Sequence, residues 1–124
     1  MKIKLLTILI FIILTFTGCS KSSESNLLNE AKDKLENYEY KSAMTILSQI
    51  INEDGNNDEA RAMYIQARKM FNAQQYESNN DFEKAIKELE DIVDINNGSK
   101  LIKKEAINKK SELEKLQEEK EKNF

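Results

Sequence analysis

Apolar side chains recur every three or four residues along most of this chain, and no proline interrupts them. That spacing is the period of an α-helix with one buried face, whereas the alternation typical of half-buried strands is missing. The sequence therefore predicts an all-α domain of about five helices arranged as antiparallel hairpins. Five apolar stripes mark the helices, over residues 28–38, 40–51, 58–76, 82–93 and 102–116.

Polar turn-forming residues separate the stripes. Gly55 follows the second stripe within a run of Asn and Asp residues, and residues 96–98, Asn-Asn-Gly, follow the fourth. Asn80 with Glu83 three residues later resembles a capping arrangement at the start of the fourth helix. Ser99 is placed to cap the fifth helix.

The amino-terminal residues have the pattern of a bacterial export signal. Lys2 and Lys4 form a short basic start, and residues 5–17 are 13 uncharged residues rich in Leu, Ile and Phe. This run is too short to cross a bilayer as a helix, which takes about 20 residues. It has the length of the apolar region of a cleaved signal peptide. The alternative is an uncleaved anchor helix that extends to the cysteine.

A short motif after the apolar run indicates lipid attachment. Phe16, Thr17, Gly18 and Cys19 resemble the lipobox of bacterial lipoproteins, in which an apolar residue and two small ones precede a cysteine. The resemblance implies that residues 1–18 are a signal peptide and that the thiol of Cys19 is joined to a diacylglycerol. A further acyl chain such as palmitate makes the attachment stable, because two chains anchor where one is marginal.

The lipobox resemblance also predicts a location. Residues 19–25 contain the lipidated Cys19 and a polar tether, which holds the folded part close to the bilayer. We expect the chain to lie in the bacterial cell envelope, anchored to the outer face of the plasma membrane. In a bacterium with an outer membrane, the anchor would be in that membrane instead.

The composition excludes most enzyme classes. There is no His, the single Cys is the lipidation site, and three scattered glycines form no phosphate-binding loop, so triads, His or Cys metal sites and cofactor motifs are absent. After the signal peptide, 17 basic residues stand against 22 acidic ones, which argues against a nucleic-acid partner. Catalysis by carboxylates alone is the alternative that stays open, but no pair of Asp or Glu residues is marked out for it. We therefore expect no enzyme, no cofactor and no metal site.

The second and fourth stripes repeat one another at an offset of 42 residues. An aromatic residue, a small Ala three positions later and spaced aliphatic residues match at every apolar position: Tyr40, Ala43, Met44, Leu47, Ile50 and Ile51 against Phe82, Ala85, Ile86, Leu89, Ile92 and Val93. This pattern resembles the second helix of tetratricopeptide repeats. The resemblance covers residues 26–97 as two units and implies a short solenoid over residues 26–116, with the last helix as a cap. A generic helical bundle is the alternative, and residues 117–124 form a charged, frayed tail.

The tetratricopeptide resemblance implies a protein-binding face lined by the first helix of each unit. Arg61 and Arg68 are the only arginines, and their spacing of seven places them on one side of the third helix, with Gln75 continuing the row. Guanidinium groups two turns apart suit acidic side chains or a terminal carboxylate of a partner. The alternative is a solvated surface row.

Two classes of function fit these expectations. The first is a membrane-anchored protein-protein interaction or scaffold module on the outer side of a bacterial membrane. The second is a lipoprotein that binds a small molecule or lipid, and an accessory subunit of an envelope or pilus assembly complex is a narrower form of the first.

Overall fold

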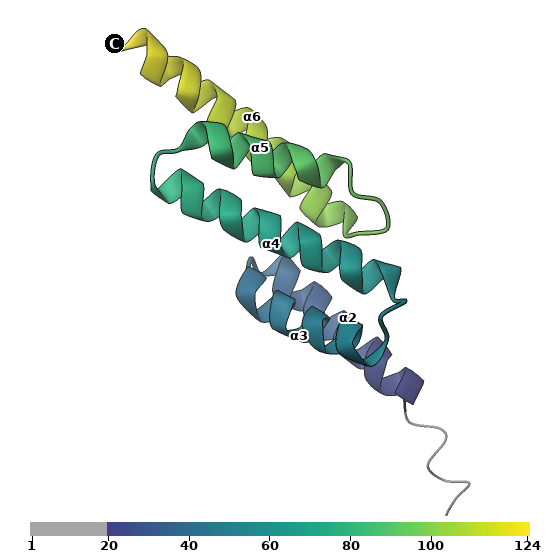
Figure 1. The fold of residues 1–124 in the computed structure, drawn as a ribbon. Coiled ribbons are helices and arrows are strands. Elements are labelled where there is room, and N and C mark those ends of the chain that lie inside the picture. The colour runs from purple at the N-terminus through teal and green to yellow at the C-terminus, as the bar shows by residue number, and fades with distance from the viewer. Residues whose placement is uncertain (1–19) are drawn as a thin grey trace, which may run out of the picture.

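The computed structural model describes residues 20–124, and within them every regular element is an α-helix, so the all-α prediction is confirmed. The predicted export signal and the predicted lipidation site Cys19 lie outside the described residues. Five helices follow one another, again as predicted (Figure 1). Their bounds are α2 (Ser20–Glu36), α3 (Tyr40–Glu53), α4 (Asp58–Ser78), α5 (Phe82–Val93) and α6 (Lys100–Lys122).

The helices form a short solenoid of antiparallel hairpins. Each helix packs chiefly against the one before it and the one after it. In Figure 1, α4 runs through the middle of the molecule, with the α2–α3 hairpin along one side and α5 along the other. The last helix, α6, lies along α5 and also contacts α4. This arrangement places α4 and α6 close enough to share a surface.

Alanines mark the places where the helices approach most closely. Every helix contributes at least one alanine with no exposed surface, namely Ala31, Ala43, Ala60, Ala67, Ala85 and Ala106. Larger side chains of the predicted stripes fill the space around them, chiefly Leu35, Leu47, Ile50, Met63, Leu89, Ile92, Ile102 and Leu113. Small residues let two backbones come together, and the flanking aliphatic chains then interdigitate.

Both hairpins turn in the same way. The Tyr38 amide donates to the Leu35 carbonyl and the Glu39 amide donates to the Lys34 carbonyl, which is the Schellman ending of a helix. In the second hairpin the Asn80 amide donates to the Glu77 carbonyl and the Asp81 amide donates to the Tyr76 carbonyl. These are the equivalent bonds, 42 residues later. Tyr38 and Asn80 take the left-handed conformation that this ending requires, with φ of 61° and 57°. The offset of 42 residues thus applies to the turns as well as to the apolar pattern.

The helix starts are capped by side chains. Asn57 accepts from the Ala60 amide at the start of α4, and Ser99 accepts from the Ile102 amide at the start of α6, as predicted. At α5 the cap is Asp81, whose side chain accepts from the Lys84 amide. The prediction that Asn80 caps this helix was wrong by one residue, because Asn80 occupies the left-handed position of the preceding turn.

The ends of the domain are more helical than we expected. Residues 20–25, assigned above to a polar tether, form the first turns of α2. Residues 117–122, assigned to a frayed tail, continue α6 as an exposed helix. No helix within residues 20–124 combines the length and apolar character that a membrane span needs.

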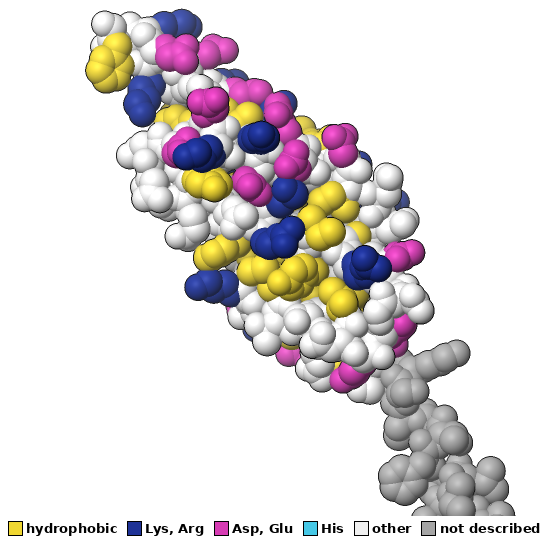
Figure 2. All heavy atoms as spheres, in the orientation of Figure 1, with side chains coloured by type: hydrophobic (Ala, Val, Ile, Leu, Met, Phe, Trp, Pro, Cys, Tyr) yellow, Lys and Arg dark blue, Asp and Glu magenta, His cyan; other side chains and the backbone are white. Residues whose placement is uncertain are grey.

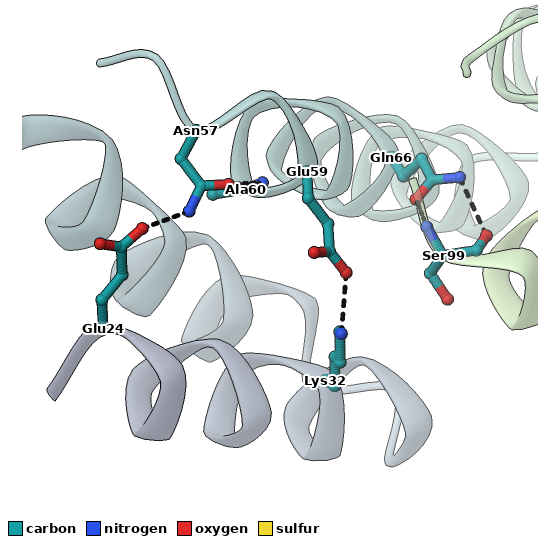
Figure 3. Close-up of polar contacts among 7 residues, drawn as sticks. All are labelled: Glu24, Lys32, Asn57, Glu59, Ala60, Gln66 and Ser99. Atoms are coloured by element: carbon teal, nitrogen blue, oxygen red, sulfur yellow. Dashed lines mark hydrogen bonds and ion pairs between the residues drawn. The ribbon is translucent and has the colours of Figure 1, made fainter. Parts of the chain in front are cut away.

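Two polar contacts fix the start of α4 against α2 (Figure 3). The Asn57 side chain donates to the Glu24 carboxylate while it caps its own helix. The Lys32 ammonium lies 2.8 Å from the Glu59 carboxylate. Both side chains of this ion pair are largely exposed, so the pair contributes at most about 1 kcal/mol.

One buried polar side chain holds α6 in place. Gln66, in the middle of α4, is 1% exposed. Its carboxamide accepts from the Ser99 amide at 2.7 Å and donates to the Ser99 carbonyl at 3.1 Å (Figure 3). A Cβ on the preceding residue, Gly98, would overlap the Gln66 carboxamide, so any other residue there would force the carboxamide to move. The start of α6 is therefore fastened to the centre of α4.

We predict that Gly98→Ala destabilises the fold by about 1–3 kcal/mol, the cost of leaving buried hydrogen-bonding groups without partners. The added methyl group would displace the Gln66 side chain from both of its bonds to Ser99. Chemical denaturation followed by circular dichroism measures the effect.

Gly55→Ala is the matched control. A Cβ at Gly55 would meet no atom nearer than the Ile51 carbonyl oxygen at 3.9 Å, and the backbone there is not left-handed. This variant should be neutral or more stable by up to about 1 kcal/mol, because alanine restricts the unfolded chain. Equal losses in the two variants would contradict the role assigned to the approach of Gly98.

Candidate binding cleft

A cleft of about 310 Å³ opens between α4, α6 and the turn that joins α2 to α3. Three separate parts of the chain form its sides, and the buried Leu89 of α5 lies at its base. We refer to it as the cleft. The other residues that line it are Tyr38, Tyr40, Met70, Ala73, Gln74, Glu77, Glu105, Asn108, Lys109 and Glu112.

Two tyrosines form one side of the cleft. Tyr40 is 2% exposed and packs into the core, whereas Tyr38 is 57% exposed. Their rings meet edge to face, with centroids 6.4 Å apart and planes at 78°. Tyr38 holds a left-handed backbone conformation, which costs a residue with a side chain about 1–2 kcal/mol. A large aromatic side chain is thus displayed from a position that favours glycine or asparagine.

The opposite side of the cleft is charged. The Lys109 ammonium lies 2.8 Å from the Glu77 carboxylate across α4 and α6, and 3.5 Å from the Glu112 carboxylate. The hydrogen bond that the Lys109 ammonium donates to Glu77, followed by the attraction of both carboxylates, raises the pKa of Lys109 in spite of its partial burial. Glu105 has no ion pair with any described residue. With three carboxylates and one ammonium, the cleft has a net charge of −2.

The Tyr40 hydroxyl makes no hydrogen bond with a described residue, although the side chain is almost fully buried. Burial is the main cause that raises its pKa to about 12, and the nearby Tyr38 and Glu105 add to the effect. Tyr40 is therefore a neutral phenol at physiological pH. Its hydroxyl oxygen is not among the fully buried unpartnered atoms of the described residues, so it is open to the cleft and can bond water or a ligand there.

The groups in the cleft are suited to binding. Aromatic rings, carboxylates and the amides of Gln74 and Asn108 surround an apolar floor formed by Met70, Ala73 and Leu89. Among residues 20–124, no three His, Cys, Asp or Glu side chains come together in a way that would hold a metal ion.

The arginines predicted to bind a partner lie elsewhere. Arg61 and Arg68 are both exposed and line a second, more open groove between α3 and α4, which we call the arginine groove. Its other lining residues are Ser48, Ile51, Tyr64 and Ile65. The structure brings the two arginines together as expected. Gln75 is exposed and lines neither the arginine groove nor the cleft.

The arginine groove and the cleft lie on opposite sides of α4. Met70 and Glu77 follow Arg68 by two and nine residues, which corresponds to rotations of about 200° and 180° around the helix. The arginine row therefore faces α3, and the cleft lies on the side of α4 that faces α6 and the turn joining α2 to α3. The predicted binding face therefore stays a prediction, and the structure places its arginines on the side of α4 that faces α3.

The two sides also differ in charge. The chain has 22 acidic residues, but none occurs in residues 41–52 of α3 or 60–76 of α4. We call the side of α3 and α4 that carries the arginine groove the acid-free side. Lys41 belongs to it, with its ammonium 5.0 Å from the centre of the Phe71 ring. Figure 2 shows hydrophobic side chains bordered by Lys and Arg over α3 and α4, while acidic side chains gather over α5 and α6.

Sequence reasoning placed both cleft tyrosines among the apolar stripes and did not single out Glu105. One signal of the special position of Tyr38 was present in the sequence. At the offset of 42 residues, Tyr38 aligns with Asn80, and asparagine before the second of two matching helices is typical of a left-handed turn. A tyrosine at that position departs from the expected residue type.

Comparison with known proteins identifies no relative. No protein-family model matches the chain, and searches of curated proteins and of solved structures also return no match.

We predict that Tyr40→Phe alters the dependence of stability on alkaline pH. The folded chain holds the phenolic proton of Tyr40 more tightly than the unfolded chain, whose tyrosines have the ordinary pKa of 10.0. The resulting stabilisation is complete below pH 10 and is lost as the pH rises through about 12. It amounts to about 2–3 kcal/mol. Wild type and variant should have equal free energies of unfolding at pH 8. At pH 12 the free energy of unfolding of wild type should be lower than that of the variant by about this amount.

The absorbance of tyrosinate provides a second readout. The wild type should show a late ionisation step at the raised pKa of Tyr40, and that step should be absent from Tyr40→Phe. A wild-type titration in which all four ionise together would contradict the burial of the hydroxyl. At neutral pH the variant should be as stable as wild type, because the hydroxyl leaves no protein partner behind.

Proposed function

We propose that this chain is a lipoprotein, anchored through Cys19 on the outer side of a bacterial membrane, that binds a segment of a protein partner in the cleft. It acts by holding that partner at the membrane, without chemical turnover. The lipobox resemblance supports the anchor, and the tetratricopeptide resemblance supports a protein partner. In that family the first helices line the binding face, and by that resemblance α4 would be such a helix while α6 would occupy the next such position.

The observation that carries the proposal is the composition of the cleft. Exposed aromatic surface beside buried apolar residues is typical of protein-binding sites, where tyrosine is enriched. Tyr38 supplies such a ring at the opening of the cleft, over a floor that includes Met70 and Ala73. The charged side chains of α6 form a polar rim on the opposite side.

We predict that a photoreactive residue at Gln74 captures one dominant protein partner in native cells. Gln74 is exposed and lines the cleft. Its neighbour Gln75 is also exposed and lines neither groove, so the same probe at Gln75 is a control displaced by one residue on the same helix. Adducts would be purified and identified by mass spectrometry.

The comparison of the two probes decides the proposal. A dominant protein adduct from Gln74 that is absent from Gln75 supports partner binding in the cleft. Equal and scattered adducts from both positions, or a single adduct from Gln75 alone, would show that the cleft is not the binding site.

The anchor has a separate test. Cys19→Ala should abolish incorporation of a labelled fatty acid. Ser20→Ala, a change of the neighbouring residue, should leave incorporation as in the wild type. A wild-type chain that takes up no label, or a Cys19→Ala chain that still takes it up, would contradict lipid attachment at Cys19.

A small-molecule carrier is a second candidate, because the volume of the cleft, about 310 Å³, lies at the lower end of the range for ligand pockets. Native mass spectrometry of the chain purified from its own cells distinguishes the two. A bound species of low mass would favour a carrier, whereas a copurifying protein would favour the interaction module. If that protein belongs to an envelope or pilus assembly complex, the chain is an accessory subunit.

A further inference from the structure

We propose that the cleft receives a cationic side chain, lysine or arginine, from the partner. This inference rests on the proposed function, since it specifies the chemistry of a protein segment bound in the cleft. The ligand proposed for the cleft is thus a cation, whereas the ligand expected for the arginine row is a carboxylate.

The first argument is charge. Lys109 already pairs with Glu77 and Glu112 and offsets one of the three carboxylates in the cleft. Glu105 projects from the same helix into the cleft and has no ion pair with any described residue. An anionic ligand would be repelled by the net charge of −2, whereas a cation would find a free carboxylate.

The second argument is the unused hydroxyl of Tyr40. This side chain is 2% exposed, lines the cleft and has no hydrogen-bond partner among the described residues. A neutral phenol accepts hydrogen bonds, and ammonium and guanidinium groups have only donors to offer. Glu105 lies close enough to affect the ionisation of this phenol. One cationic head group placed between them would satisfy both.

The third argument is shape. Lysine and arginine carry an apolar stem of three or four methylenes, which commonly lies along apolar surface while the charged end reaches polar groups. The floor of the cleft offers such a surface in Met70, Ala73 and Leu89. The exposed ring of Tyr38 stands beside it, and a cation within about 6 Å of a tyrosine ring is attracted by its π-face.

The residue type at position 38 agrees with this assignment. The equivalent turn of the second hairpin has Asn80 at the left-handed position, so the turn itself does not require an aromatic residue. Because more than half of the Tyr38 side chain is exposed, it gains little from burial. A contact with a ligand gives the ring a function at this position.

The test uses short peptides as probes of the polypeptide 20–124, which contains all five helices and their shared core. Three acetylated and amidated tripeptides carry arginine, lysine or citrulline between two alanines. Citrulline has nearly the shape of arginine without its charge. Binding is followed by the shifts of backbone amide signals in NMR titrations.

We expect the arginine and lysine peptides to shift the amide signals of Tyr38, Gln74 and Glu105, and to leave those of Arg61 and Arg68 unchanged. The citrulline peptide should bind at least about tenfold more weakly, since a hydrogen bond to a charged group contributes about that factor. Equal binding of arginine and citrulline peptides, or shifts centred on the arginine groove, would overturn the inference.

Variants separate the local contacts from net charge and from stability. Glu105→Gln should weaken the arginine peptide about tenfold. Glu118→Gln makes the same change of charge further along α6, on an exposed side chain outside the cleft, and should have no effect. Tyr38→Asn copies residue 80, so it should weaken the peptide while the Tm stays the same or rises. Loss of binding together with a lower Tm would indicate a structural role for Tyr38 instead.

The same variants in the cellular crosslinking experiment keep this inference separate from the proposed function. If the Gln74 probe captures a partner and Glu105→Gln abolishes the adduct, both stand. If the adduct persists unchanged in Glu105→Gln, the partner binds in the cleft without a cationic contact and only this inference fails. If Gln74 captures no partner, the proposed function fails, whether or not the peptides bind.

Discussion

The pair of hydrogen bonds between Gln66 and Ser99 links the fold to the cleft. A buried carboxamide normally destabilises a core unless its donor and acceptor are both satisfied, and here one backbone residue satisfies both. Ser99 is also the cap of α6, so the same contact fixes where that helix begins. The direction of α6 then decides which of its side chains face α4. Without this attachment, the position of α6 would depend on its apolar stripe and on partly exposed ion pairs such as Lys109–Glu77.

Much of the fold follows from local rules. The period of the apolar residues gave the number of helices, and the turn residues placed most boundaries within a few positions. The two ends were predicted less well, because the sequence argument relied on apolar stripes. Residues 20–25 and 117–122 have no such stripe, and the second segment is rich in Glu and Lys, which favour helices at exposed positions. The assignment of Asn80 as a cap failed because a turn and a cap use the same residue types in adjacent positions.

The cleft was harder to predict, since its residues come from parts of the chain that meet only after packing. The spacing of Arg61 and Arg68 correctly put them on one side of a helix, but spacing cannot say which neighbour that side faces. Tyr40 was predicted as a core residue, and its burial fits that role. Its unpartnered hydroxyl depends on how α6 passes the start of α3, which no local pattern encodes. The repeat offset was the most informative feature, because it exposed Tyr38 as the exception in a pair of equivalent turns.

The division of charge across α4 gives the molecule a preferred orientation beside a charged surface. Lys41, Arg61 and Arg68 belong to the acid-free side, and the carboxylates of the cleft lie on the other. Bacterial bilayers rich in anionic lipids attract the first side and repel the second over roughly a Debye length, about 8 Å at physiological ionic strength. For a chain held to such a bilayer at its amino-terminal end, as proposed above, attraction of one side and repulsion of the other turn the cleft toward the solution. The asymmetry of one helix would then determine which side of the tethered protein an approaching molecule meets first.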